Sequence, residues 1–367
     1  MNFELSNDQA MLADSVDRFG RETWPATERP RLLAEHGRGE IERWSAMAGL
    51  GWLALAFSET QGGLGGAPSD LMVVAQGLGR HLVPDAFVGC GVLAASLLGE
   101  MRSKLVDAVI AGEKRVALAL GDGDARFDHL AVATAAVRAG EGYALTGTKQ
   151  FVLDGADADW FLIPARTSAS DAIEIFLVRR STPGVEVDRF RALDHHRHAR
   201  LRLDNVVVGA DAMIVIDNAE QALDHAVQRA TLALCAEAVG AMDALNEMTL
   251  DYLKTRKQFG VSIGSFQALQ HRMVDMAIAA EEARSITYRA TLEMEAGVDD
   301  GGRMVAAAKT RVGQTGLFVG RQAVQLHGGI GTSDELVIGH YLKRLMMIDM
   351  TFGHADYHRA RFAALLA

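Results

Sequence analysis

The chain has 367 residues, of which 49% are hydrophobic and 23% charged, and its formal net charge is −10 at pH 7. This length and composition indicate a globular protein of about two or three domains. The negative charge argues against a nucleic-acid binder, because such proteins concentrate Lys and Arg on one face. Cys90 and Cys235 lie in apolar surroundings, which is typical of buried thiols in a reducing compartment. We find no signal pattern and no apolar run of about 20 residues, so we expect a cytoplasmic protein without a membrane segment.

The N-terminal part is predicted to be helical. Ser6 is a suitable N-cap for a helix over 6–22. Four apolar residues of this stretch fall at helical spacing, namely Met11, Leu12, Val16 and Phe19. Further helices are predicted over 40–47, 69–78 and 88–98. The glycine-rich stretch 57–66 must form a loop, because Gly costs about 1 kcal/mol at each helical position.

The pattern changes near Lys114 to short β-prone runs separated by glycines. Strands are predicted over 116–120, 130–137, 143–147, 150–153, 160–165, 173–178, 185–187 and 201–208. Their alternation and regular turns favour a small antiparallel β domain or barrel. Long amphipathic stretches then predict helices over 217–254, 265–296, 302–326 and 335–347. The sequence therefore predicts an α+β fold with domains over 1–113, 114–216 and 217–367.

Two loops with glycines separate the C-terminal helices. The first contains Arg256-Lys257-Gln258-Phe259-Gly260, and the second begins at Gln325 and contains Gly328-Gly329. An Arg beside amide side chains and exposed backbone amides can grip a pyrophosphate. Both loops follow helical patterns, whereas a nicotinamide-binding fingerprint follows a strand. Flavin adenine dinucleotide (FAD) fits this description better.

The order of a helix, an Arg-x-Gln-Phe-Gly loop, two helices and a Gln-x-x-Gly-Gly-x-Gly loop resembles the C-terminal half of the acyl-CoA dehydrogenase family. The arrangement of a helical, a β and a helical domain extends the resemblance over nearly the whole chain. The stretch 59–65 resembles the family's N-terminal loop, although Ser58 replaces the usual Pro, and a simple turn between helices is an equal alternative.

The resemblance implies an oligomer that binds FAD and an acyl-CoA and passes electrons to an electron-transfer flavoprotein. It also implies which residues contact the flavin bound by a neighbouring subunit: Arg256, Gln258, Phe259, Gln267, Gln325, Gly328 and Gly329.

The reaction implied by the resemblance is α,β-desaturation, in which a carboxylate removes the α-proton of the thioester while the β-hydrogen leaves as hydride to FAD. The base must be a carboxylate in apolar surroundings, where its pKa is raised toward the working pH. The two positions that supply this base in the family correspond to Ala230 and Gly353, and neither is an acid. The family's flavin strands, Thr-Glu-Pro and Trp-x-Thr, correspond to 119–122 and 151–153, which lack the hydroxyl groups.

The chain thus keeps the residues that would contact a neighbouring subunit's flavin. It lacks the base and the hydroxyl groups that its own site would need. This asymmetry favours the base-lacking subunit of a heterotetrameric acyl-CoA dehydrogenase, resembling two-subunit enzymes that act on steroid side chains or dicarboxyl-CoA substrates. One alternative is a homo-oligomeric dehydrogenase that uses His354 or Asp356 as base. Another is a catalytically silent homologue that binds acyl-CoA or acts as a scaffold.

Other histidines offer weaker signals. A metal site over 194–198 is not favoured, because adjacent histidines in a strand point to opposite faces and no Glu or Cys completes a tetrahedral set. We expect His196 and His198 to lie in a solvated loop or at a sheet edge. His271 and His327, beside the glycine loops, are more consistent with structural roles than with catalysis.

Overall fold

The computed structural model describes residues 4–34, 38–98, 104–123, 126–168, 170–298 and 301–366. The chain divides into two compact units. The first, which we call the helical unit, comprises Met1–Gly39, Ala67–Pro84 and Thr231–Ala367, and the second, the sheet unit, comprises Glu40–Gly66 and Asp85–Ala230. These units are not continuous in sequence, so the predicted division at residues 113 and 216 stays a prediction.

The helical unit contains α1 (Asn7–Thr23), α2 (Arg29–Ala34) and α4 (Pro68–His81) from the N-terminal part. As predicted, Ser6 caps α1: its side chain accepts a hydrogen bond from the Gln9 amide, and the Gln9 side chain accepts one from the Ser6 amide. Val16 and Phe19 are buried, whereas Met11 is 64% exposed.

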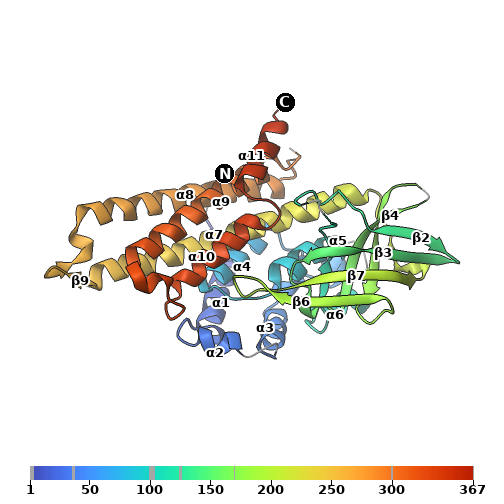
Figure 1. Cartoon of the computed structure of the whole chain (residues 1–367), viewed down its shortest axis with the longest axis horizontal. Helices are drawn as coiled ribbons and strands as arrows, with labels where there is room; N and C mark the ends of the chain where they lie inside the picture. Colours follow the sequence, from blue (N-terminus) through green and yellow to red (C-terminus); the bar gives the residue numbers. More distant parts are fainter. Residues whose placement is uncertain are drawn as a thin grey trace. The chain divides into compact units, whose positions relative to one another are not determined.

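The C-terminal helices of this unit pack around α9 (Arg303–His327), which contacts α8 (Gln267–Glu295), α10 (Ile338–Met350) and α11 (Ala355–Ala364) (Figure 1). Three glycines one turn apart on α9 face α10. A Cβ atom at Gly320 would lie 2.8 Å from Leu342, and one at Gly313 would lie 2.2 Å from Asp349 Oδ1. The missing side chains therefore let the two helices approach closely.

The 37-residue helix α7 (Ala219–Thr255) supplies its residues from Thr231 onward to the helical unit. Glu237 on this helix forms a two-pronged ion pair with Arg344 of α10, with both N–O distances at 2.6 Å. The two side chains are only 6% and 5% exposed. The pair is thus a buried charge contact whose partners neutralise one another.

Replacing Arg344 with Met is expected to destabilise the chain by about 3 to 5 kcal/mol, because it leaves the Glu237 carboxylate buried without its partner. The double variant R344M/E237L should recover most of this loss. Urea unfolding of the three proteins measures the difference. Equal stability of the single and double variants would show that the carboxylate is not the source of the loss.

In the described residues of the sheet unit, eight strands form one sheet, in the order β6-β7-β3-β2-β4-β5-β8, with β1 beside β4. The strands are β1 (Val116–Leu118), β2 (Ala135–Ala139), β3 (Gly142–Val152), β4 (Trp160–Thr167), β5 (Ile173–Arg179), β6 (Val185–Arg191), β7 (Arg197–Val208) and β8 (Met213–Ile214).

The sheet is mixed, whereas the sequence predicted an antiparallel one. Both β1 and β2 run parallel to β4, and the remaining pairs are antiparallel. β2 forms a hairpin with β3 along one edge. Its other edge pairs with β4, which lies later in the chain and runs in the same direction as β2. The predicted strands 143–147 and 150–153 join as β3, whose pairing with β7 shifts register twice.

This unit also contains η1 (Trp52–Ala54), η2 (Glu59–Gln61), the π-helix η3 (Phe87–Ala94), α5 (Ala95–Leu98), α6 (Lys104–Ile110), η4 (Gly155–Asp157) and η5 (Ala210–Ala212), together with most of α3 (Arg38–Gly49) and the start of α7. The stretch 57–66 is a loop, as predicted. A Cβ atom at Gly63 would lie 2.2 Å from the Phe57 carbonyl oxygen, so the turn itself requires this glycine.

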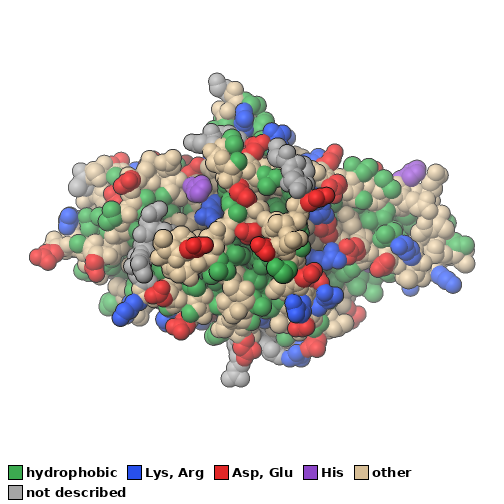
Figure 2. Space-filling model, turned by 180° about the vertical axis from the view of Figure 1, so that it is seen from behind, with side chains coloured by type: hydrophobic (Ala, Val, Ile, Leu, Met, Phe, Trp, Pro, Cys, Tyr) green, Lys and Arg blue, Asp and Glu red, His purple; other side chains and the backbone are tan. Residues whose placement is uncertain are grey.

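Charged side chains of both signs are dispersed over the face shown in Figure 2, which accords with a chain that concentrates no single charge there. Within the described ranges, no helix combines the length and the apolar character that crossing a membrane requires.

Candidate functional site

The Arg256 loop is a tight β-hairpin. β9 (Lys257–Gln258) pairs with β10 (Val261–Ser262), so Phe259 and Gly260 form the two-residue turn. Their φ angles are +54° and +81°, the pattern of a type I′ turn, which explains the glycine. Space around the Gly260 Cβ position is open to 4 Å, and the Phe259 side chain is 92% exposed.

The polar residues predicted to hold a cofactor lie at the surface around this hairpin. Arg256 directly follows α7, Gln258 lies in β9, and Gln267 is the first residue of α8; all three are exposed. Figure 1 shows the hairpin at the ends of these two helices. Backbone hydrogen bonds of 2.8 Å from the Arg256 amide to Tyr252 and from the Ile263 amide to Arg256 fix the main chain. The arrangement leaves a guanidinium and two amides facing solvent.

The second glycine loop begins where α9 ends. Gln325 is exposed, and Gly328 has a φ of +68° with no atom within 4 Å of its Cβ position. Gly329 also has open space around it. These features fit a loop whose backbone can approach a ligand.

The helix ends that precede the two loops contact each other through Tyr252 and His327. Their rings stack at 4.4 Å, and the Tyr252 hydroxyl donates a hydrogen bond of 3.4 Å to the His327 carbonyl oxygen. His327 Nδ1 lies 2.8 Å from the Ala323 carbonyl oxygen, and burial lowers the pKa of the imidazole. His327 therefore has a structural explanation, and the pair couples the position of the hairpin to that of the glycine loop.

The base position at Gly353 cannot accept a side chain as it stands. Phe352 and Gly353 link α10 to α11 with φ angles of +59° and +112°. A Cβ atom at Gly353 would lie 2.3 Å from the Tyr357 ring and 3.1 Å from His358 Nε2. An acid at this position would require the turn to be rebuilt.

Two buried side chains hold this turn. Lys309 of α9 donates hydrogen bonds from Nζ to the carbonyl oxygens of Asp349 at 2.8 Å and Gly353 at 2.7 Å. His358 Nε2 lies 3.0 Å from the Phe352 carbonyl oxygen. Neither residue was predicted from the sequence to have a role. Lys309 could have been noticed because it lies on the helical stripe of α9 that otherwise carries buried apolar residues.

Burial lowers the pKa values of both groups and so favours their neutral forms. It lowers the pKa of Lys309 to about 8, partly offset by Cys235 and Asp349. It lowers the pKa of His358 to about 3, with a further contribution from the nearby Lys309 charge. The His358 imidazole is therefore neutral at physiological pH.

The alternative bases, His354 and Asp356, lie at the N-cap and in the first turn of α11. His354 is the N-cap, and its Nδ1 atom accepts a hydrogen bond of 3.2 Å from the Tyr357 amide. Asp356 is exposed and forms an ion pair of 3.1 Å with Arg359. The other base position, Ala230, is fully buried in α7. These surroundings differ from the apolar pocket that a carboxylate base requires.

The stretch 119–122 corresponds to the first of the family's flavin strands. Its Asp122 side chain binds other groups of this chain. Asp122 accepts hydrogen bonds from Lys149 Nζ at 2.6 Å, from Thr134 Oγ1 at 2.6 Å and from the Ala133 amide at 3.1 Å. Lys149 Nζ also donates to the Pro164 carbonyl oxygen at 2.8 Å. Both charged side chains are almost fully buried. This cluster does not fit the hydroxyl donors expected beside an isoalloxazine ring.

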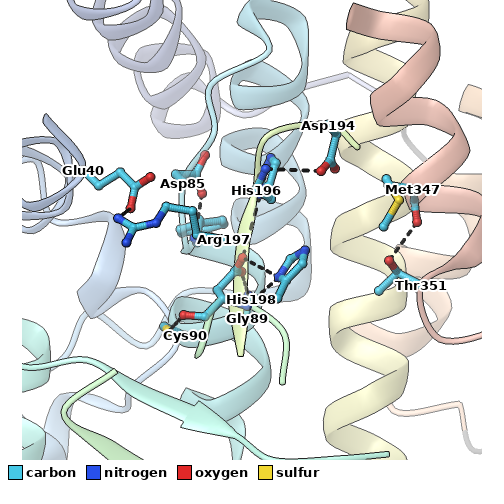
Figure 3. A network of polar contacts seen from close by, with 12 residues as sticks. Glu40, Asp85, Gly89, Cys90, Asp194, His196, Arg197, His198, Met347 and Thr351 are labelled. Atoms are coloured by element: carbon cyan, nitrogen blue, oxygen red, sulfur yellow. Dashed lines mark hydrogen bonds and ion pairs between the residues drawn. The ribbon is translucent and has the colours of Figure 1, made fainter. Parts of the chain in front are cut away.

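The predicted solvation of His196 and His198 was wrong: they are 7% and 1% exposed. The Asp154 amide donates to His198 Nδ1 at 3.0 Å, and Asp154 Oδ2 accepts from the Gly89 amide of the π-helix at 3.0 Å. Figure 3 labels Gly89, His196 and His198 of this network. His196 Nδ1 is 3.8 Å from Asp154 Oδ1. The part of the chain that the structure describes holds no group of three or more His, Cys, Asp or Glu residues suited to a metal ion.

Three family models match the chain in order. They are the N-terminal domain of acyl-CoA dehydrogenase over residues 6–104, its middle domain over 117–206 and its C-terminal domain over 219–366. The chain belongs to the acyl-CoA dehydrogenase family. Members of this family are FAD-dependent oxidoreductases that act on the CH–CH group of an acyl-CoA.

Known proteins similar to this acyl-CoA dehydrogenase match it over nearly their full length. The L-prolyl-[peptidyl-carrier protein] dehydrogenase of Serratia sp. (strain ATCC 39006) is 27% identical, over 100% of this chain and 98% of that protein. The ChsE4-ChsE5 complex from Mycobacterium tuberculosis matches with a TM-score of 0.90 and 26% identity, covering 100% of this chain and 99% of the other. The Tcur3481-Tcur3483 steroid ACAD variant matches with a TM-score of 0.84 and 28% identity, covering 98% of each.

Restoring an acid at Gly353 should not give this acyl-CoA dehydrogenase a base. G353E and G353A should both lower the free energy of unfolding by about 2 to 4 kcal/mol, because a side chain at this φ is strained and meets Tyr357. Denaturant unfolding measures this loss, with G49A as a control, since Gly49 has open space and an ordinary φ. A stable G353E variant that desaturates acyl-CoA unaided would contradict this reading.

Protonation of His358 should contribute to acid unfolding. The pKa of His358 is lowered in the folded chain, so its contribution to stability is complete above about pH 6.5 and is lost as the pH falls toward about 3. H358Q should remove an acid-sensitive contribution on the order of 3 kcal/mol. Urea unfolding between pH 7 and pH 4 tests this against H271Q, which alters an exposed imidazole. Parallel stability profiles of wild type and H358Q would sink the prediction.

Proposed function

We propose that this acyl-CoA dehydrogenase is the base-lacking subunit of a heterotetramer, in which a sister chain supplies the catalytic carboxylate. The observation that carries the proposal is the turn at Gly353, where the backbone conformation and the Tyr357 ring leave no room for a side chain. The family's base at this position is therefore missing together with the space that it would occupy.

The helical unit, in contrast, has the groups that a flavin shared between subunits would need. We propose that the Arg256 guanidinium binds the pyrophosphate of the sister chain's FAD, because a guanidinium pairs with phosphate oxygens in a two-pronged geometry. We assign amide contacts with the cofactor to Gln258, Gln267 and Gln325, and backbone contacts to Gly328 and Gly329. The exposed Phe259 ring would lie against the cofactor or the sister chain.

FAD bound at such a shared site supplies the hydride acceptor for α,β-desaturation. The residues of this chain would bind and orient the cofactor, while proton removal would fall to the sister chain. Two structurally similar proteins support the assembly, since one is described as the ChsE4-ChsE5 complex and the other as a Tcur3481-Tcur3483 steroid ACAD. We therefore propose an acyl-CoA with a large substituent, of the steroid side-chain kind, as the substrate.

The competing proposal is a homo-oligomer that uses His354 as its base. The lone pair on His354 Nδ1 already receives the Tyr357 amide proton, so Nε2 carries the hydrogen when the ring is neutral. Accepting a substrate proton would require His354 to give up the N-cap of α11. The heteromeric proposal needs no such rearrangement.

Flavin content distinguishes the two proposals. The chain purified alone should be nearly colourless, and co-expression with an acyl-CoA dehydrogenase homologue encoded beside it should give one FAD for every two chains, measured by absorbance. In that pair, R256Q should weaken FAD binding by about tenfold or more, because it removes a charge-assisted hydrogen bond. R321Q, which removes an exposed guanidinium from α9, is the matched control. One FAD per chain without a partner would overturn the heteromeric proposal.

A further inference from the structure

The residues proposed to contact FAD come from two loops that are far apart in sequence. The first follows α7 at Arg256, and the second begins at Gly328, where α9 ends. One dinucleotide binds tightly to both loops only if their spacing is fixed before it arrives. Two aromatic side chains lie where they could fix it, because Tyr252 lies one helical turn before the first loop and His327 directly precedes the second.

Tyr252 contacts the backbone next to both loops. Its carbonyl oxygen accepts a hydrogen bond of 2.8 Å from the Arg256 amide, at the point where the hairpin leaves α7. Its hydroxyl donates a hydrogen bond of 3.4 Å to the carbonyl oxygen of His327. The last four carbonyl groups of a helix lack partners within that helix, so the hydroxyl caps the end of α9. One tyrosine thus links the end of α9 to the start of the hairpin.

The imidazole of His327 is held in one orientation. It is 5% exposed, and its Nδ1 atom lies 2.8 Å from the Ala323 carbonyl oxygen. Because a carbonyl oxygen can only accept, the hydrogen of the neutral ring is on Nδ1. Burial lowers the pKa of this ring, which is therefore neutral at physiological pH. The Tyr252 ring stacks on a fixed and uncharged surface, with 26° between the two ring planes.

The glycine loop folds back onto the same histidine. Gly328 leaves α9 with a φ of +68° and a ψ of −148°, a conformation that only Gly adopts readily. A Cβ atom at Gly331 would lie 3.0 Å from His327 Cβ and 2.7 Å from the Val324 carbonyl oxygen. The loop is therefore packed on the last turn of α9, and a displaced His327 would displace the loop backbone as well.

We propose that Tyr252 and His327 are a positioning pair, whose stacked rings hold the Arg256 hairpin and the glycine loop at the spacing that the FAD dinucleotide requires. This inference rests on the proposed function in taking FAD as the ligand of both loops. Neither ring takes part in the chemical step, and the pair acts through the backbone of the loops. Its loss should loosen both loops and, as a consequence, weaken cofactor binding.

Amide hydrogen–deuterium exchange on the chain alone provides the first test. Y252L removes the ring and the hydroxyl, so exchange should become faster in both loops, including the bonded amides of Ile263 and Ser333. Y288L is the matched control, because Tyr288 is also a half-buried tyrosine of the helical unit, and its hydroxyl also donates a hydrogen bond, to Gln76. It should leave both loops unchanged. Unchanged exchange of the glycine loop in Y252L would overturn the proposal.

The affinity for FAD provides the second test, in whichever assembly binds the cofactor. Y252L should raise the FAD dissociation constant about tenfold, whereas Y252F, which keeps the stacked ring, should stay within about threefold of wild type. Because Tyr252 acts partly through the Arg256 hairpin, the loss in Y252L/R256Q should be smaller than the product of the two single losses.

Two outcomes of the affinity test would contradict the positioning role. Strictly multiplicative losses in the double variant would show that Tyr252 does not act through the Arg256 hairpin. An equal loss of affinity in Y288L would show that any damage to the helical bundle weakens FAD binding. The flavin content of the wild-type protein decides the heteromeric proposal separately, because only the ratios between variants bear on the pair.

Discussion

The buried ammonium of Lys309 fixes the part of the fold on which the functional reading depends. It donates to two backbone carbonyl oxygens, those of Asp349 and Gly353, and so ties the end of α10 to the turn before α11. Two successive residues in that turn have positive φ. Because the turn is held by main-chain groups, the loss of the acid at Gly353 is a change of backbone as well as of side chain.

The two halves of the family's flavin site have diverged in different ways. In the sheet unit, Asp122 and Lys149 bind one another and the surrounding groups, so this position is part of a packed core. In the helical unit, Tyr252 and His327 support two loops whose polar side chains remain exposed. Buried polar groups must find partners within the chain, whereas exposed ones can be satisfied by water or by a ligand.

Hydrophobic periodicity predicted the long helices to within about three residues, because their apolar stripes repeat over many turns. It failed for the parallel pairing of β1 and β2 with β4, which depends on contacts between distant segments. The two glycine-containing loops could be predicted as loops because their motifs are local. The role of His358 could not, since only the packing of separate elements reveals that this imidazole is buried.

The tip of the β9-β10 hairpin has a consequence for how the cell must make this protein. Phe259 keeps 92% of its surface in water, next to the partly exposed ring of Phe266. An apolar tip of this kind is a point of unwanted association in any subunit that is produced in excess. In the proposed heterotetramer, matched synthesis of the two chains would shorten the time that the hairpin spends uncovered and so limit aggregation of orphan subunits.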